Sequence, residues 1–510
     1  MAARALIATG QPRRAARLVT RHGPPGRVDR LDTRLLWRLA RAELAGATGV
    51  PAEAARHLAA GMATLHRHRT QFGCLDLQTG AAVHGQDLAR AGLAVALANG
   101  APTAIYRWSE RARAQALLLP PVRPPADPAT AAALAELRQS RHALRATELA
   151  GRPAGGLRTR VEALQRTIRE HAWSTPGRRD PSGPAPAPFT AVKAALGDTT
   201  LVAYLRDGPA LRALVVVDGS ASLATLGGYA AVAESVLRLR ADLDAQAGRA
   251  LPHRLARSVA AATRHDAATL AAAVLDPLLP RIGDRDLVVV PTGILMTVPW
   301  SVLPGCAGRP VTVAPSATAW LAATGRLTGH GPGPQPPALL VAGPGNARGE
   351  AEVRAIAALR PHATVLTGAD ATPAATLGVL GDVAVAHLAA HGRHQAENAL
   401  FSTLELADGP LLGYDLQQVP QAPAMVVLSS CDLGLADIRP GDETFGMVTA
   451  LLSAGSATVV ASVARVADDS AMDVMTGYHA AVTAGQRPAA ALAQAVPPDL
   501  PTGFVCFGAG

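Results

Sequence analysis

The sequence predicts an all-α region followed by an α/β domain whose mostly parallel sheet is flanked by helices. In residues 1–173, leucine and alanine recur at three- and four-residue steps, the period of amphipathic helices. Beyond residue 189, short apolar β-prone runs alternate with helical segments, as in parallel sheets. The residues between are rich in proline and lack periodicity, which predicts a linker. We therefore expect a helical region at 1–173, a linker at 174–188 and an α/β domain at 189–510.

Glycine and proline divide the helical region into short helices. Breaks are expected near residues 10–12, 23–26, 49–51 and 99–102. Antiparallel helix pairs with such short connections are typical of α-solenoids, so the pattern predicts degenerate tetratricopeptide-like repeats. A further helical stretch at 128–171 is expected to connect the repeats to the next domain.

The α/β domain begins with a predicted hairpin that turns at Asp207-Gly-Pro209. Continuously apolar runs after it predict strands that are buried on both faces of the sheet. These strands are expected at residues 287–290, 339–342, 383–388, 425–429 and 458–462, and helices at 229–246, 266–279, 350–359 and 444–454. Asp442 is expected to cap the last of these helices and Glu443 to lie in its first turn.

Composition narrows the class of protein. A chain of 510 residues exceeds one ordinary domain, and a hydrophobic content of 49 % is sufficient for a packed core. The net charge of +9 comes from arginine that is scattered along the chain, which argues against nucleic-acid binding. Lys193 is the single lysine and lies in no glycine-rich loop, so a P-loop nucleotidase is excluded.

We expect neither a signal peptide nor a membrane-spanning segment in this sequence. No apolar run reaches the ~18 residues that span a bilayer, and the first ten residues lack the apolar stretch of a signal peptide. The cysteines Cys74, Cys306, Cys431 and Cys506 show no CxxC spacing, which fits a reducing compartment. We therefore expect a cytoplasmic protein that does not contact a membrane.

Two polar residues follow apolar runs that predict parallel strands. His391 comes after the run at 383–388, and Cys431 comes after the run at 425–429. Because parallel strands end at the same edge of a sheet, an imidazole and a thiol are expected to meet there. This is the layout of a cysteine nucleophile with its general base, and the backbone N–H groups of Gly392 and Cys431 would bind the oxyanion. The competing interpretation is that both side chains only pack.

Two rival chemistries have weaker support. His387, His391 and His394 have the spacing of metal ligands, but Leu388 replaces the glutamate of an HExxH zinc helix. Ser429 and Ser430 lack the flanking glycines of a nucleophile elbow. No metal or organic cofactor is therefore expected.

From about residue 290 onward, the chain resembles the CHAT domain family, which is often joined to tetratricopeptide repeats. The matching segments are residues 290–295, 298–300, 314–317, 387–392 (His-Leu-Ala-Ala-His-Gly), 404–409, 427–431, 441–443, 454–455 and 460–462. The resemblance implies a caspase-haemoglobinase-like fold and a cysteine peptidase of the clan that includes caspases and separases. It assigns the dyad to His391 and Cys431, and it makes the helical region a recognition or control element.

The resemblance also implies substrate-binding residues. Val463 and Ala464 would lie beside the bound peptide, and Ala464 stands where the family often has tryptophan. Asp432 is the acidic residue expected after the cysteine. Asp468 or Asp469 falls near the position at which separase-like relatives bind arginine at P1, which suggests a basic P1 residue. Surface or capping roles explain these two aspartates equally well.

Two functions therefore compete at this point. The first is a cysteine peptidase that acts on a protein or peptide, with a protein partner on the N-terminal helices. The second is a catalytically silent scaffold that uses the CHAT-like domain and the helices for protein binding.

Overall fold

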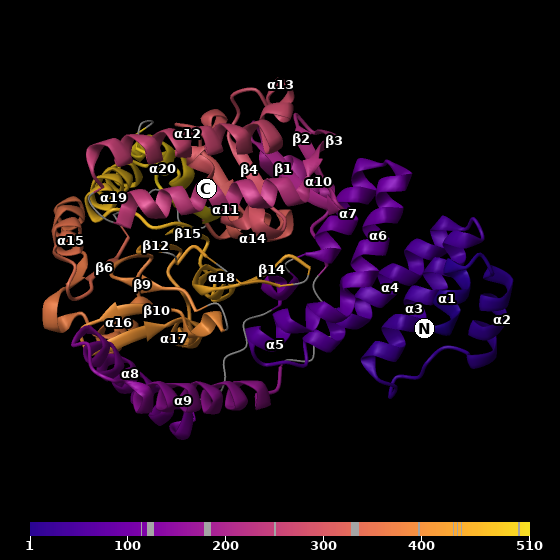
Figure 1. The fold of residues 1–510 in the computed structure, drawn as a ribbon, viewed down its shortest axis with the longest axis horizontal. Helices are drawn as coiled ribbons and strands as arrows, with labels where there is room; N and C mark the ends of the chain where they lie inside the picture. Colours follow the sequence, from indigo (N-terminus) through magenta and orange to yellow (C-terminus); the bar gives the residue numbers. More distant parts are fainter. Residues whose placement is uncertain are drawn as a thin grey trace.

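The computed structural model describes residues 1–113, 115–119, 127–177, 185–248, 251–327, 336–395, 398–431, 433–435, 437–439, 441–497 and 500–510. An all-α region comes first, and a mostly parallel sheet flanked by helices follows it (Figure 1), which confirms the predicted fold class. Within these ranges, every helix is too short or too polar to span a lipid bilayer.

The all-α region opens with seven α-helices. They are α1 (Ala2–Ala8), α2 (Pro12–His22), α3 (Leu31–Ala47), α4 (Pro51–Arg69), α5 (Leu75–Gly80), α6 (Gln86–Asn99) and α7 (Pro102–Ala112). Proline begins α2, α4 and α7, at the position where its missing N–H would have no helical partner. Helix α3 packs against α4 and α6 against α7, as expected for helix pairs. We call residues 1–119 the helical arm.

Helices α8 (Pro128–Leu149) and α9 (Gly155–Ser174) pack as a pair on the other side of the molecule from α1 and α2 (Figure 1). Leu137 and Ile168, from this pair, belong to one hydrophobic cluster with Phe401 of the α/β domain. Arg138 of α8 also donates to the buried carboxylate of Asp415, with Nη2 2.5 Å from Oδ1. The pair is therefore attached to the α/β domain as well as connected to it in sequence.

The α/β domain is built on one eleven-stranded sheet. Its strands, in spatial order, are β3 (Ser220–Gly228), β2 (Ala210–Val217), β1 (Thr200–Asp207), β4 (Leu287–Val290), β5 (Val311–Val313), β16 (Phe504–Gly508), β15 (Thr458–Ser462), β12 (Met425–Ser429), β8 (Val385–Ala389), β6 (Ala338–Ala342) and β7 (Thr364–Leu366). Neighbours run parallel except at β1–β2, β2–β3 and β15–β16. The predicted hairpin and all five predicted buried strands are confirmed; β3, β5, β7 and β16 were not predicted.

Both faces of the sheet carry helices. One face packs against α11 (Tyr229–Gly248), α12 (His253–Val274), α13 (Leu279–Ile282), α16 (Pro373–Leu380), α17 (Gly413–Gln418) and α18 (Met447–Ser453). The other face packs against α10 (Phe189–Leu196), α14 (Ala317–Leu327), α15 (Ala347–Leu359), α19 (Asp468–Thr483) and α20 (Pro488–Ala495). Burial on both faces explains why the strands are continuously apolar.

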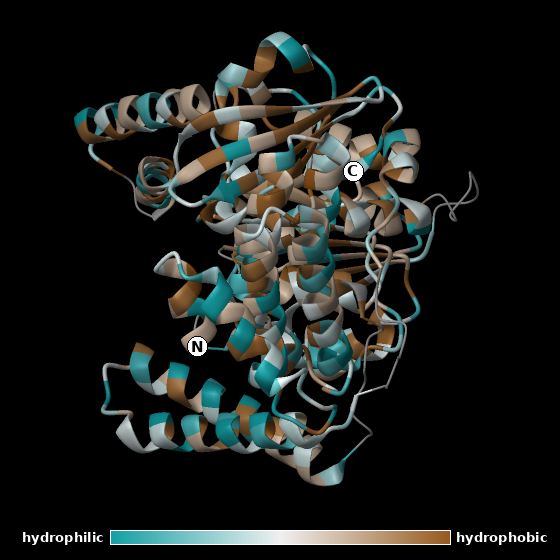
Figure 2. Ribbon diagram, turned by 90° about the vertical axis from the view of Figure 1, so that its right-hand side faces the viewer, coloured by the Kyte–Doolittle hydropathy of each residue, from teal (hydrophilic) through white to brown (hydrophobic). Residues whose placement is uncertain are grey.

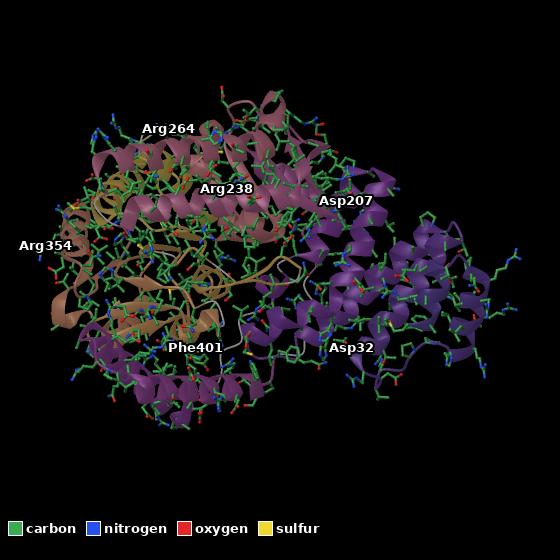
Figure 3. All side chains as sticks on the ribbon, viewed as in Figure 1. Asp32, Asp207, Arg238, Arg264, Arg354 and Phe401 are labelled. Carbon is green, nitrogen blue, oxygen red and sulfur yellow. The ribbon has the colours of Figure 1, made fainter. Side chains whose placement is uncertain are left out.

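The hydropathy of the chain follows these layers. In Figure 2 the strands are mostly brown, whereas teal residues gather on the outward sides of the helices. Arg264 of α12 and Arg354 of α15 are exposed and lie at the periphery of the molecule (Figure 3). The charge is therefore placed on the surface, apart from the buried polar clusters described below.

Two small sheets lie beside the large one. The first consists of β9 (Gly392–Arg393), β10 (Thr403–Leu406) and β11 (Gly409–Leu412). The second is a hairpin of β13 (Asp437–Arg439) and β14 (Glu443–Phe445). The expected helix at 444–454 is thus too long, because α18 begins only at Met447.

The expected capping roles of Asp442 and Glu443 are wrong for the same reason. Asp442 lies in the turn before β14, with a positive φ of 50°, and Glu443 lies in the strand itself. Both carboxylates are bound by segments far away in the sequence, so tertiary contacts override the local helix signal.

Candidate functional site

The two predicted dyad residues follow neighbouring strands at equivalent positions. Strands β8 and β12 are parallel neighbours, and their last paired residues are Ala389 and Ser429. His391 and Cys431 each lie two residues beyond this pair. The Ser430 hydroxyl donates to the Ala390 carbonyl at 2.6 Å and so ties the two chain segments together between strand and dyad. The register therefore brings the imidazole and the thiol to one edge of the sheet.

His391 and Cys431 line the same pocket. Its described lining consists of Asn346, Gly349, Glu352, Ala390, His391, Ser429, Ser430, Cys431, Val466, Asp468, Ala471 and Phe504. His391 is exposed and Cys431 is half-buried, with Sγ 3.8 Å from the carbonyl oxygen of Val466. The pocket is narrow, with a free volume of about 20 Å³, so a side chain could enter only if the lining moved.

Cys431 differs from the other three cysteines in its exposure. Cys74, Cys306 and Cys506 are buried. Burial raises the pKa of Cys74 from 9.0 to about 11 and the pKa of Cys306 and of Cys506 to about 12. Because the thiolate is the nucleophile, these three thiols are unreactive near neutral pH. Cys431 is the accessible thiol of the four.

Gly392 occupies a position where only glycine fits. It begins β9 and pairs with Leu404 of β10. A Cβ at this position would lie 2.7 Å from the carbonyl oxygen of Cys431 and 2.7 Å from Cγ of Leu433. The backbone of Gly392 therefore approaches the backbone of Cys431 closely.

The predicted substrate-binding residues fall into different places. Val463 and Ala464 are 0 % exposed and do not line the pocket, and the Val463 N–H already donates to the Gly503 carbonyl. Asp468, at the start of α19, lines the pocket. Asp469 points elsewhere, because its Oδ1 lies 2.5 Å from Nε of Arg348. Asp432 lies outside the described residues.

The histidines of the rival metal hypothesis do not come together. His387 is buried in β8, where its Nδ1 lies 3.1 Å from Nε2 of His479. His394 contacts the hydroxyl of Ser402, with Nδ1 3.4 Å from Oγ. His391 lies at the pocket, so the three histidines occupy three different environments. Their spacing of four and three residues therefore does not correspond to a shared metal site.

Sequence reasoning missed a buried polar cluster below the pocket. Glu352 of α15 lies with Oε1 2.9 Å from Nε2 of His387, which in turn contacts His479 of α19. All three are at most 2 % exposed. In the sequence, Glu352 is one more polar residue on an amphipathic helix, so no local signal marks it.

Sequence reasoning also missed the polar contacts that hold the β13–β14 hairpin against the helical arm. Glu443 forms a buried ion pair with Arg69 of α4, and its Oε1 accepts a hydrogen bond from the Gln115 backbone N–H at 2.9 Å. Asp442 accepts from Thr292 Oγ1 and from the Gly293 N–H at 2.8 and 2.9 Å. We call these contacts, together with the contacts of Arg113 described in the next paragraph, the junction.

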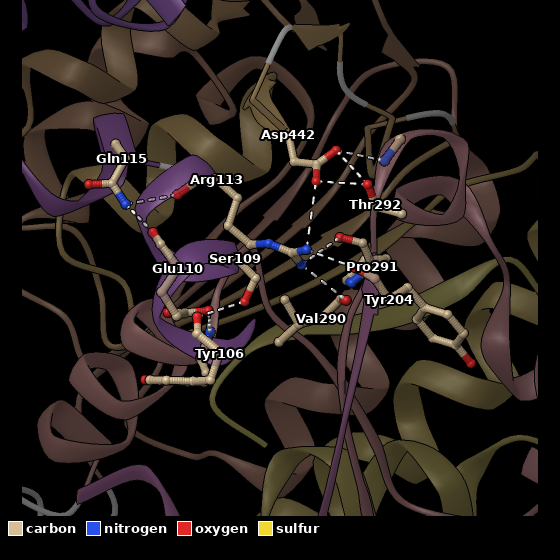
Figure 4. A network of polar contacts seen from close by, with 12 residues as sticks. Tyr106, Ser109, Glu110, Arg113, Gln115, Tyr204, Val290, Pro291, Thr292 and Asp442 are labelled. Carbon is tan, nitrogen blue, oxygen red and sulfur yellow. Dashed lines mark hydrogen bonds and ion pairs between the residues drawn. The ribbon is translucent and has the colours of Figure 1, made fainter. Parts of the chain in front are cut away.

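Arg113 is the central residue of the junction on the arm side (Figure 4). Its Nη2 donates to the Tyr204 carbonyl at 2.7 Å and lies 3.9 Å from Oδ2 of Asp442. Nη1 reaches the carbonyls of Val290 and Pro291 at 3.4 Å. The guanidinium therefore joins the arm, the sheet and the hairpin that follows Cys431 in the chain.

The structure was compared with solved structures and with curated proteins. Two crystal structures of the Saccharomyces cerevisiae separase–securin complex are similar over 99 % and 94 % of this chain, with TM-scores of 0.48 and identities of 8 % and 7 %. This chain spans about half of those separase chains, 52 % and 45 %. The cysteine proteinase gingipain R is similar over 54 % of this chain and 74 % of its own, with a TM-score of 0.33 and 12 % identity. The comparison with curated proteins gave no match.

The sequence itself also matches a family. Residues 264–497 match the CHAT domain, a stretch that contains His391, Cys431 and the β13–β14 hairpin. The predicted resemblance to the CHAT domain family is thereby confirmed over residues 264–497.

Proposed function

We propose that this protein is a cysteine peptidase in which His391 and Cys431 form the catalytic dyad. One observation carries the proposal: two registered parallel strands deliver an exposed imidazole and the one accessible thiol of the four to the same pocket. The CHAT domain match supports it independently. A thiol beside an imidazole can hydrolyse a peptide bond through an acyl-enzyme, as in caspase-like peptidases.

The proposed reaction has two steps. The Cys431 sulfur attacks the scissile carbonyl while His391 accepts the thiol proton and then passes it to the leaving amine. The backbone N–H groups of Gly392 and Cys431 would bind the oxyanion, since Gly392 lies against the Cys431 backbone. Water then attacks the thioester, with His391 as base, and releases the acid product and the free thiol.

We further propose that the helical arm controls or targets this site. The junction connects the arm to the hairpin that begins six residues after Cys431 in the chain. A protein partner bound on the arm could therefore change the hairpin, and with it the narrow pocket. The related separases were crystallised with a protein partner, securin. The cytoplasmic location stays a prediction.

A basic P1 residue is the proposed substrate preference. Asp468 lines the pocket beside Cys431 and would meet a cationic side chain there. Asp469, which is paired with Arg348, is the weaker candidate of the two. Val466 lines the pocket where Val463 and Ala464 were expected to lie beside the peptide, so contacts with the peptide backbone would shift along the chain.

The test is labelling with a thiol-reactive peptide probe that carries arginine at P1, followed by intact-mass analysis. The expected result is one adduct at Cys431, no adduct in Cys431→Ala, and labelling slowed by about 10² or more in His391→Ala. Labelling of Cys431 no faster than that of Cys74 would contradict an activated nucleophile.

A scaffold is the second candidate function, and the narrowness of the pocket is the observation that favours it. Cys431→Ala separates the two functions. If the protein is a scaffold, this variant keeps both its cellular effect and its partner binding. If it is a peptidase, the effect is lost while partner binding persists.

A further inference from the structure

The net charge of the chain is concentrated in helices α1–α4. Residues 1–69 contain thirteen arginines and four acidic residues, which gives +9, the formal charge of the whole chain. The remaining residues contain thirty-five lysine and arginine side chains and thirty-five acidic ones, so they are balanced. Arginine therefore occurs along the whole chain, but the uncompensated positive charge belongs to the first part of the helical arm.

Helix α2 carries the densest part of this charge, and it lies at the opposite end of the molecule from α15 (Figure 1). Its four arginines are all exposed and share one face of the helix: Arg13, Arg14, Arg17 and Arg21. The opposite face is buried against α1 and α3 through Ala15 and Val19. Arg27, in the loop that follows, is exposed as well. We call these five arginines the basic stripe.

The protein itself does not neutralise the basic stripe. The first acidic residue of the chain is Asp29, and its Oδ2 accepts a hydrogen bond from the Gly26 N–H at 2.6 Å. Within the described ranges, none of the five arginines forms an ion pair, in contrast to Arg4, which binds Glu43. Five guanidinium groups at this surface are therefore left to solvent or to a ligand.

The arrangement of the basic stripe works against the helix that carries it. Arg13 and Arg14 lie in the first turn of α2, where the helix dipole disfavours positive charge, and this turn contains no acidic residue. Arg17 is four residues away from both Arg13 and Arg21, and like charges at this spacing destabilise a helix. Residues that oppose the local structure and form no internal ion pair indicate a role toward a ligand.

The surroundings of the basic stripe favour a protein segment over other polyanions. Residues 1–36 contain no Phe, Trp or Tyr, so the aromatic platforms on which single-stranded nucleic acids stack are missing. The apolar face of α2 is already buried, whereas a helix that binds a membrane surface needs that face free. Val28, directly after Arg27, is 99 % exposed and offers an apolar contact to a peptide.

We propose that the basic stripe is the docking site for an acidic segment of a partner protein, in which carboxylate side chains flank an apolar residue. Each guanidinium can bind a carboxylate through two parallel hydrogen bonds, and Val28 would meet the apolar residue. The proposal rests on the control role proposed for the arm and names its class of partner. The stripe is connected to the junction through α3 and α4, because Arg69 ends α4 and binds Glu443.

The binding experiment measures the fluorescence anisotropy of a labelled peptide that repeats Glu-Glu-Leu, with a Gln-Gln-Leu repeat as the neutral control. The expected result is saturable binding of the acidic peptide that weakens with added salt, and no binding of the neutral one. The triple variant Arg13→Gln, Arg17→Gln, Arg21→Gln should weaken this binding about 5- to 100-fold. Since glutamine and arginine have similar helix propensities, the thermal midpoint of this variant should not fall.

Helix α12 provides a matched control variant. Arg254, Arg257 and Arg264 of this helix are exposed and form no ion pair with the described residues, and Arg264 lies at the periphery of the molecule (Figure 3). Changing these three residues to glutamine lowers the net charge by the same amount as the α2 variant. It should leave the affinity for the acidic peptide unchanged, because the charge that is removed lies outside the basic stripe.

Three results would overturn the inference: no saturable binding of the acidic peptide, equal weakening by the two triple variants, or tighter binding of single-stranded RNA or anionic lipid vesicles than of the peptide. A failure of the proposed control role looks different, since the peptide would bind without changing the rate at which Cys431 is labelled. A failure of the proposed peptidase appears as absent labelling of Cys431 whether or not the peptide binds.

Discussion

Glu443 and Glu352 are buried to the same extent, 1 % and 2 % exposed, but their surroundings differ. At the junction, Glu443 meets a guanidinium and a backbone N–H that both bind its Oε1. Below the pocket, Glu352 Oε1 lies 2.9 Å from Nε2 of His387, but this oxygen accepts no hydrogen bond from the described residues. A buried carboxylate held by two permanent donors is strongly structural, whereas the weaker contacts of Glu352 predict a smaller contribution to stability.

The largest effect is expected at the junction. Glu443→Ala leaves the Arg69 guanidinium buried without its carboxylate, which should lower the free energy of unfolding by about 3–5 kcal/mol. Urea unfolding followed by circular dichroism measures this loss. The double variant Arg69→Met with Glu443→Leu removes both charges and should recover much of it. If Glu352→Ala costs as much as Glu443→Ala, the two carboxylates are equally structural and the contrast fails.

An intermediate effect is expected from acid, and it should act on the pocket cluster. Since the pKa of His479 in the folded protein lies well below 6.5, its value in the unfolded chain, the unfolded state binds this proton first. Above about pH 6.5, His479 therefore does not lower the free energy of unfolding. Below this pH, the free energy of unfolding falls by up to about 1.4 kcal/mol per pH unit because of His479. The difference between the free energies of unfolding at pH 7 and at pH 5 should be smaller in His479→Phe than in the wild type. Equal acid losses in wild type and variant would mean that His479 does not titrate in this way.

The smallest effect is expected at an exposed ion pair. Arg160 of α9 contacts Glu136 of α8 at 2.6 Å, but their side chains are 54 % and 45 % exposed. Glu136→Ala should change the free energy of unfolding by less than about 0.5 kcal/mol, because solvent screens both charges. The same urea titration provides the baseline for the two larger effects. A loss above about 1 kcal/mol would show that burial is not what separates these pairs.

Contacts between residues that follow paired strands could be predicted from the sequence, whereas contacts between residues far apart in the sequence could not. His391 and Cys431 follow apolar strands, and parallel pairing alone places them at one edge, so their position could be predicted. Arg69 and Glu443 are 374 residues apart, and no local pattern links them. Glu443 was expected in a helix because the apolar run begins directly after it, yet its partner on α4 holds it in a strand.

The pocket was predicted only in part for a similar reason. Asp468 was expected there from a family resemblance, and it lines the pocket. Glu352 was not expected, because its side chain reaches the pocket from a helix that precedes the dyad by some forty residues. Val463 and Ala464 were expected beside the substrate, but both are buried, and they do not line the pocket.

Strand β16 has a consequence for how the protein is made. It lies between β5 and β15, and it is the only described strand that joins the β1–β5 half of the sheet to the half with His391 and Cys431. The ribosome synthesises it after all the other described strands, so the eleven-stranded sheet cannot be completed until translation reaches residues 504–508. A nascent chain that is stalled or truncated before that point carries the dyad on an incomplete sheet.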